Sequence, residues 1–463
     1  MEPPFLLNPM SHFYISAAHK SSGKTSLSIG LCAALADRGL AVQPFKKGPD
    51  YIDPLWLSQA AGRVCHNLDF YTMPRDEIDA RFARSMQGAD IGIIEGNKGL
   101  FDGLDIDGSN SNAALAAQLG SPVVLVLDTQ GMTRGVAPLI LGYQAFDKNI
   151  RIGGVILNKV GGTRHEGKLR RVIEHYTDVP VVGAVYRSED MHITERHLGL
   201  VPSNEAMQSM AQIRLMGKRV AEQVDLDRLL EIAATASAPP VVPQSARPAA
   251  VNQGVRIAYA KDSAFGFYYA SDLEALTAAG AKLIPFSPLK DAELPDVDGL
   301  FLGGGFPETH LEELGKNTEI GRKITQFIEN GGPAYAECGG LMYLCRQLTW
   351  NGKQGRMLGV VPADVVMHER PQGRGYVRLR ETEQHPWPSG HEIAAHEFHY
   401  SALENVGEGV DFAYRVERGF GIDGRNDGVR YRNLLASYAH LRDTHNNHWT
   451  ERFVNFVRQC KLS

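Results

Sequence analysis

Short apolar runs alternate with longer amphipathic stretches through the first half of the chain. The apolar runs are HFYISAA from His12, IGIIEG from Ile91, PVVLVLD from Pro122, GGVILNKV from Gly153 and PVVGAV from Pro180. Between them lie helix-like stretches such as TSLSIGLCAALADRG from Thr25 and EGKLRRVIEHY from Glu166. Continuous apolar strands are typical of a sheet that is buried on both faces, and strands that alternate with helices form βαβ units. The pattern predicts an α/β domain with a doubly wound parallel sheet over residues 11–232.

A stretch without either periodicity follows this region. Residues 233–253 are rich in Ala, Pro and Ser, and we interpret them as an interdomain linker. Beyond the linker, the runs VRIAYA, AKLIPFSP, GLFLGG and GPAYAE have the character of buried strands, and the segments between them are helix-like. We therefore expect a second α/β domain over residues 254–463.

Length and composition narrow the class of protein. The 463 residues suit two domains, and 43% hydrophobic with 22% charged residues is typical of a water-soluble protein. A formal charge of −5 offers no attraction for nucleic acid or anionic lipid, so neither a nucleic acid nor a membrane is an expected partner. The five cysteines have no CxxC spacing, which disfavours a zinc site and a disulfide framework. With no export signal at the N-terminus, we expect a cytoplasmic protein.

A phosphate-binding loop is predicted between the first strand and the first helix. The run from Ala17 to Thr25 reads AAHKSSGKT, and it has the strand–loop–helix context that such loops require. Backbone N–H groups would hold the phosphates, Lys24 would neutralise their charge, and Thr25 would ligate Mg²⁺. Ala18 stands where the first glycine of the pattern usually lies. A helix start without a ligand is the weaker alternative.

Acidic residues follow two of the predicted strands. Glu95 ends one apolar strand and is a candidate Mg²⁺ partner, because ligands of doubly wound sheets bind at the carboxyl ends of the strands. Asp128 ends another strand, but an acid there also serves as a helix cap, so it ranks lower. The loop FKKGPDYIDP, residues 45–54, carries two cations and two carboxylates, and composition alone does not separate a site from a solvated loop.

A second candidate site centres on Cys338. The sequence PAYAECGG places this cysteine between an apolar strand and a pair of glycines, which predicts a sharp turn with an exposed nucleophile. We expect the following helix N-terminus to lower the pKa of the thiol. The glycine-rich strand end GGGFPE, residues 303–308, would supply an oxyanion hole, and His440 is the candidate base. Cys345, placed inside the following helix, is expected to be a buried hydrophobe.

Ten sequence blocks, in order, resemble the cobyrinic acid a,c-diamide synthase family. These blocks are the phosphate loop, VQPFKKGPDYIDP, NLDFYTM, EGNKGLFDG, GVILNKV, HLGLVPSNE, LFLGGGFPE, AYAECGGLMYL, HEFHYS and SYAHL. In this family a dethiobiotin-synthetase-like ATPase domain is fused to a class I glutamine amidotransferase domain. The resemblance implies a cytoplasmic carbon–nitrogen ligase that uses ATP and Mg²⁺ to activate two acetates of a tetrapyrrole and amidates them with ammonia from glutamine. Because free ammonia is mostly protonated at neutral pH, we also predict an internal passage for it between the domains. A homodimer is one candidate assembly, and the oligomeric state stays open.

The resemblance assigns a role to each candidate residue. Cys338 would attack glutamine with His440 as its acid–base partner, and Gly304, Gly305 and Gly339 would form the glutamine and oxyanion site. ATP would be bound by Ser22, Gly23, Lys24, Thr25, Ser26 and Asn158. Mg²⁺ would be held by Thr25, Glu95 and Asp50, with Asp69 as a further candidate, and the substrate by Lys46, Asp50, Tyr51 and Asp53.

The chain departs from the family pattern in two respects. Triad amidotransferases carry an acid two residues after the histidine, but that position is Arg442 here, so the third triad member is open and Glu397 is one candidate. The stretches EGNKGLFDG, DGSNSNA and RHE resemble the branch that amidates siroheme or a related metallo-sirohydrochlorin, which makes siroheme the first expectation for the substrate. Cobyrinate or hydrogenobyrinate is the alternative substrate. A regulatory ATPase with a catalytically dead amidotransferase domain is the alternative from another functional class.

Overall fold

The computed structural model describes residues 7–196, 199–204, 209–237 and 254–462. The chain divides into two compact units, one built from residues 1–70 and 74–244 and the other from residues 71–73 and 245–463. The predicted linker started at residue 233, but residues 233 and 234 form the end of helix α8 (Leu226–Ala234). Residues 238–253 of that linker lie outside the described part of the chain. Among the described residues, no helix combines the length and the apolar character needed to cross a bilayer.

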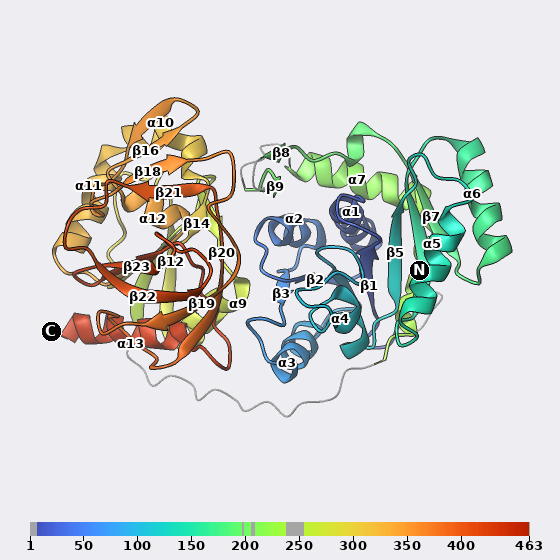
Figure 1. The fold of residues 1–463 in the computed structure, drawn as a ribbon, viewed down its shortest axis with the longest axis horizontal. Coiled ribbons are helices and arrows are strands. Elements are labelled where there is room, and N and C mark those ends of the chain that lie inside the picture. Colours follow the sequence, from blue (N-terminus) through green and yellow to red (C-terminus); the bar gives the residue numbers. More distant parts are fainter. Residues whose placement is uncertain (1–6, 197–198, 205–208, 238–253, 463) are drawn as a thin grey trace. The chain divides into compact units, whose positions relative to one another are not determined.

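The first unit is a parallel sheet with the strand order β3-β2-β4-β1-β5-β6-β7 (Figure 1). The strands are β1 (His12–Ala17), β2 (Val42–Lys47), β3 (His66–Leu68), β4 (Ile91–Glu95), β5 (Val123–Asp128), β6 (Ile152–Val160) and β7 (Val181–Tyr186). The helices are α1 (Lys24–Asp37), α2 (Ile52–Ala61), α3 (Arg75–Ser85), α4 (Asn112–Gln118), α5 (Val136–Phe146), α6 (Thr163–Tyr176), α7 (Ser209–Gln223) and α8 (Leu226–Ala234). A two-stranded ribbon, β8 (Glu195–Arg196) and β9 (Gly199–Leu200), precedes α7.

Side-chain alternation divides this sheet into two faces. One face packs against α1, α2, α7 and α8 through a single cluster that includes Phe13, Ile93 and Val126. On the opposite face, Phe45 of β2 contacts Phe82 of α3, with ring centroids 4.8 Å apart. Because successive residues of a strand point to opposite faces, neighbours in sequence at the end of a strand serve different sides of the sheet.

The second unit contains a nine-stranded mixed sheet with the order β12-β10-β13-β15-β24-β23-β22-β19-β20. Its strands are β10 (Val255–Ala260), β12 (Ala281–Phe286), β13 (Gly299–Leu302), β15 (Ala334–Glu337), β19 (Gly373–Glu381), β20 (Glu392–His399), β22 (Asp411–Arg418), β23 (Asn426–Tyr431) and β24 (Leu434–Ser437). Smaller sheets are formed by β11 (Phe265–Phe267) with β14 (Gly304–Gly305), and by β16 (Gln347–Trp350), β17 (Lys353–Arg356), β18 (Asp364–Met367) and β21 (Ser401–Glu404).

The helices of this unit are α9 (Ala270–Ala278), α10 (Leu311–Lys316), α11 (Thr318–Glu329), α12 (Gly339–Leu344) and α13 (Trp449–Leu462). The expected α/β architecture is confirmed. After residue 346 the chain adds further strands, most of them antiparallel, that the sequence patterns had not indicated. Helix α12 ends at Leu344, so Cys345 follows the helix rather than lying inside it. Cys345 is fully buried, as expected of a core thiol.

Candidate active sites

The phosphate loop joins β1 to α1 at the carboxyl end of the sheet. Gly23 lies just before the helix with φ 84°, a left-handed conformation that favours glycine. A Cβ at this position would lie 2.2 Å from Nδ2 of Asn158, so the loop has no room for a side chain there. The Asn158 amide donates to the Ser22 carbonyl at 2.8 Å and thereby braces the loop. Lys24 is buried, and burial, reinforced by the charge of Lys46, lowers its pKa to about 8.

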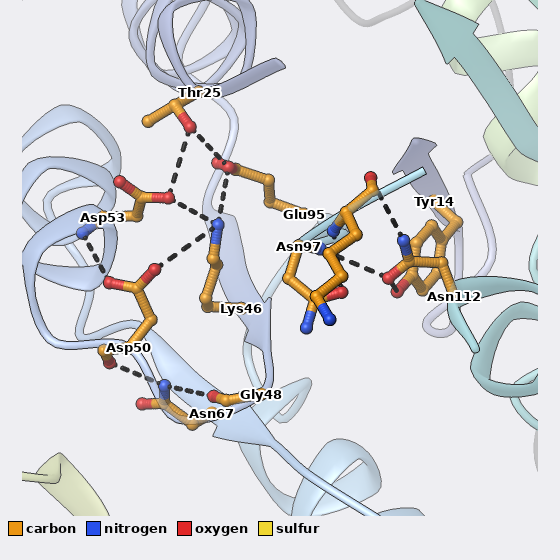
Figure 2. Close-up of polar contacts among 11 residues, drawn as sticks. Tyr14, Thr25, Lys46, Gly48, Asp50, Asp53, Asn67, Glu95, Asn97 and Asn112 are labelled. Carbon is orange, nitrogen blue, oxygen red and sulfur yellow. Dashed lines mark hydrogen bonds and ion pairs between the residues drawn. The ribbon is translucent and has the colours of Figure 1, made fainter. Parts of the chain in front are cut away.

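Lys46 gathers three carboxylates beside this loop (Figure 2). Its ammonium donates to Glu95 at 2.8 Å and to Asp53, and it lies 3.8 Å from Asp50. The hydroxyl of Thr25 donates to Glu95 at 2.8 Å and to Asp53 at 3.2 Å. The register pairs Lys46 with Glu95 across β2 and β4, so both side chains leave the sheet on the face that packs against α1. Lys46, predicted to bind the substrate, is therefore brought together with the first helix, and we call it the charge clamp of these three carboxylates.

The loop after β2 is fixed by short polar contacts. The Asn67 amide donates to the carbonyls of Gly48 and Asp50, at 2.9 and 2.8 Å. The carboxylate of Asp50 accepts from the Asp53 backbone N–H at 3.1 Å, and Tyr51 forms the N-cap of α2 between these two acids. Burial, together with the charge of Asp53, raises the pKa of Asp50 to about 7. This loop is an ordered cluster of charges rather than a solvated loop.

The donors around Thr25 fit a magnesium ion. Among the described residues no group of three or more His, Cys, Asp or Glu is arranged as a metal cage. Mg²⁺ at nucleotide sites is instead held by one or two protein oxygens together with phosphate oxygens. The second carboxylate oxygen of Glu95, Oε2, is buried and has no hydrogen-bond partner among the described residues. Burial also raises the pKa of Glu95, so a cation beside it would restore the charged form.

Two further acids named from the sequence are Asp128 and Asp69. Asp128, at the end of β5, pairs with Lys159 of β6 at 2.7 Å. Lys159 also donates to the carbonyl of Ser21, so Asp128 helps to hold Lys159 against the phosphate loop. Asp69 is buried directly after β3 and lies close enough to Lys47 for their charges to interact, and its role as a further metal candidate stays a prediction.

Cys338 occupies a strained turn between β15 and α12. Its φ of 45° and ψ of −101° are rare for a residue with a side chain, and such strain, on the order of 1–3 kcal/mol, is typical of functional sites. Burial raises the pKa of the thiol, the nearby carboxylate of Glu308 adds to the increase, and the Gly339 N–H opposes it. The expected lowering by the helix N-terminus is therefore wrong, because α12 is a short helix and desolvation is the larger effect. The thiol needs a base to become a nucleophile.

His440 has an acidic partner that the sequence patterns did not identify. Its Nδ1 lies 3.1 Å from Oε2 of Glu337, the residue immediately before Cys338. The other oxygen of Glu337 accepts from the Leu441 backbone N–H at 2.9 Å and from the Tyr335 hydroxyl at 2.6 Å. Since an ionised carboxylate only accepts, this contact places a proton on Nδ1 and leaves Nε2 as the basic nitrogen. The imidazole also stacks on His396, with centroids 4.9 Å apart and an interplanar angle of 15°.

Glu397 does not replace the missing triad acid. Its two carboxylate oxygens accept from the backbone N–H groups of Phe420 and Gly421, each at 2.7 Å, and so shape the turn after β22. Arg442, at the position that usually carries the acid, lies over the ring of Tyr269 at 4.8 Å. The pairing of Glu337 with Ser437 across β15 and β24 instead brings the acid to the strand that precedes His440.

The glycines of β14 bring the turn and the histidine together. A Cβ on Gly304 would lie 2.7 Å from Cε1 and 3.5 Å from Nε2 of His440, so the basic nitrogen faces this glycine. A Cβ on Gly339 would lie 2.8 Å from the backbone nitrogen of Gly305. The predicted nucleophile turn, base and glycine strand end therefore meet in one site. Gly305 has no room for a side chain either, since a Cβ there would lie 2.0 Å from the carbonyl oxygen of Ala264.

Comparison with known proteins identifies both units. Residues 15–201 match the CobQ/CobB/MinD/ParA nucleotide binding domain, and residues 256–447 match the CobB/CobQ-like glutamine amidotransferase domain. The two matches each contain one of the sites described above.

Relatives of the whole chain are also known. A protein named cobyrinate a,c-diamide synthase from Magnetococcus marinus is 49% identical and covers 96% of this chain and 97% of its own length. Proteins of the same name are 40% identical in Methanosarcina acetivorans, over 92% of this chain and 91% of theirs, and 42% identical in Picrophilus torridus, over 96% and 98%. With a nucleotide-binding domain and a glutamine amidotransferase domain in one polypeptide, the chain is a carbon–nitrogen ligase that takes its amide nitrogen from glutamine. It belongs to the cobyrinate a,c-diamide synthase family.

Proposed function

We propose that the chain amidates the a and c acetates of cobyrinate, or of its metal-free counterpart hydrogenobyrinate, with ATP and glutamine. The observation that carries this proposal is similarity over nearly the full length of relatives with that name. The expectation of siroheme as first substrate finds no support among these relatives, so the alternative substrate of the sequence analysis takes its place. A flat ring with acetate side chains is common to these substrates, which is why the short motifs did not separate them.

ATP makes the acetate reactive in this proposal. A carboxylate resists attack because of its charge, and transfer of the γ-phosphoryl group converts it to an acyl phosphate that ammonia can attack. Lys24 and the backbone N–H groups of the loop hold the phosphates, and Lys46 organises Asp50 and Asp53 beside the incoming acetate. A bound Mg²⁺, held by Thr25 and Glu95 with Asp50 nearby, would neutralise charge on the phosphate oxygens.

Glutamine supplies the ammonia in the second unit. Nε2 of His440 takes the proton of the Cys338 thiol as the sulfur attacks the amide carbon of glutamine. Backbone N–H groups at Gly305 and Gly339, which lie close to each other, would stabilise the developing oxyanion. His440 then returns the proton to the departing nitrogen as the C–N bond breaks, and water releases glutamate from the thioester. Glu337 keeps the imidazole oriented through both steps, which disfavours the alternative of a dead amidotransferase domain.

The test compares two macrocycles under one condition. Purified protein is incubated with ATP, Mg²⁺ and glutamine, and with either cobyrinate or siroheme, and the products are identified by mass. Replacement of two carboxyl hydroxyls by amino groups on cobyrinate is the expected result, with glutamate and ADP released in step. Diamide formation on siroheme alone would refute the choice of substrate. Glutamine hydrolysis without any amidated ring would refute the synthase itself.

A further inference from the structure

Lys47 lies at the carboxyl end of β2, directly after the charge clamp Lys46. The two lysines serve opposite faces of the sheet. Lys46 pairs in register with Glu95 on the α1 face, whereas Lys47 shares the face of Phe45, which packs against Phe82 of α3. Both lysines stand at the edge of the sheet where ligands of this architecture bind.

The ammonium of Lys47 has no hydrogen-bond or ion-pair partner among the described residues. The side chain is only 2% exposed, and its nitrogen reaches solvent at the tip of an otherwise buried stem. The nearby charges are those of Asp69, Lys98 and Lys46. Burial lowers the pKa of Lys47 to about 8; Asp69 opposes this effect, and the two other lysines add to it. A cation at the tip of a buried stem, with no partner among the described residues, is placed to bind an anion that arrives from solvent.

The phosphates of ATP are poor candidates for this anion. They are served by the loop before α1 and by Lys24, which belong to the opposite face of the sheet. The macrocycle, by contrast, carries further carboxylates around its rim besides the two acetates that react. A ring placed with one acetate beside Lys46 would present other carboxylates along the same edge of the sheet.

Resting on the proposed function, we propose that Lys47, with Lys98 beside it, binds a non-reacting carboxylate of the tetrapyrrole and so sets which acetates reach the phosphate loop. Lys98 is exposed on the segment after β4 and adds a second positive charge at this edge. The charge-assisted ion pair that forms on binding contributes affinity, so the bound substrate stabilises the site that recognises it.

The experiment measures steady-state constants for Lys47→Met, Lys47→Arg and a matched control, Lys148→Met, whose lysine is exposed in the same unit. The ring is the one that wild-type protein amidates, cobyrinate or siroheme. We expect Lys47→Met to raise the KM for the ring roughly tenfold to a hundredfold, the loss of one charge-assisted hydrogen bond. The KM for ATP, the glutaminase rate and kcat at saturating ring should stay near wild type. Lys47→Arg should recover most of the affinity, and Lys148→Met should change nothing.

A second arm modifies the ring instead of the protein. Esterifying the carboxylates other than the two reacting acetates should weaken binding to wild-type protein and cause little further loss in Lys47→Met, because both changes remove the same ion pair. The thermal midpoint of ligand-free Lys47→Met should stay near that of wild type, since the ammonium has no partner among the described residues that the variant would lose.

Three results with Lys47→Met would contradict the proposed carboxylate site. The first is an unchanged KM for the ring, and the second is a raised KM for ATP. The third is a lower thermal midpoint with all activities reduced, which would show that Lys47 has a structural role. If wild-type protein amidates neither ring, both the proposed function and this site are refuted. If wild-type protein is active and Lys47→Met is equally active, only this site is refuted.

Discussion

Replacing Glu337 by glutamine tests the orientation of His440 most directly. The substitution keeps the shape of the side chain but leaves one oxygen that can accept hydrogen bonds. In the native site Oε1 accepts from two donors, the Leu441 N–H and the Tyr335 hydroxyl, whereas Oε2 faces His440 alone. The amide oxygen should therefore take the Oε1 position, and its NH₂ group should face Nδ1. His440 would then carry its proton on Nε2 and could not accept one from Cys338.

The size of the loss follows from the interaction removed. A hydrogen bond to a charged group contributes about 1.5–3 kcal/mol, which corresponds to roughly a tenfold to hundredfold change in rate. A fixed wrong tautomer costs more, on the order of 10⁴ in kcat for the equivalent change in a serine protease triad. We therefore expect glutaminase kcat/KM to fall by about 10² to 10⁴ in Glu337→Gln.

The assay separates glutamine hydrolysis from synthesis. Glutamate release should fall in Glu337→Gln, while synthesis from added ammonium salt at raised pH should remain near wild type. Glu397→Gln is the matched control, because this buried acid accepts two backbone N–H groups but makes no hydrogen bond with His440. It should lower the thermal midpoint more than the glutaminase rate. Full glutaminase activity in Glu337→Gln, or equal losses in both variants at equal stability, would refute the assigned orientation.

Three further outcomes test the two sites. Cys338→Ser should abolish glutamine-dependent synthesis but retain synthesis from ammonium salt, and equal loss of both would contradict the division of labour. Gly23→Ala should weaken ATP binding at least tenfold, as measured by equilibrium dialysis, because its φ of 84° disfavours a side chain and the new Cβ would meet Asn158. The pKa of Lys24 is lowered to about 8, so its charge is present below that pH and lost above it. ATP affinity should thus be flat from pH 6.5 to about pH 7.5 and then decline above about pH 8, and constant affinity to pH 9.5 would contradict this role.

Local sequence patterns were sufficient to predict those parts of the sites whose chemistry depends on residues adjacent in sequence. The phosphate loop, the turn at Cys338 and the glycines at 303–305 each place their groups within one strand–loop–helix connection, so a contiguous motif carries the geometry. The acids at strand ends could also be predicted from the sequence, since parallel strands end at a common edge of the sheet. Glu95 was named for this reason and Lys46 from the family resemblance, and the register of β2 and β4 brings the two together.

The sequence by itself determined the two α/β units and the family, and it predicted the nucleophile and its base. Tertiary structure alone brings an acid to that base, because Glu337 and His440 are 103 residues apart and meet only through the pairing of β15 with β24. It also sets the direction in which the pKa of Cys338 shifts, since desolvation depends on everything that surrounds the thiol, whereas the helix start that suggested the opposite shift is visible in six residues. Strand alternation likewise separated Lys46 from Lys47, two identical neighbours that the fold sends to different faces of one sheet.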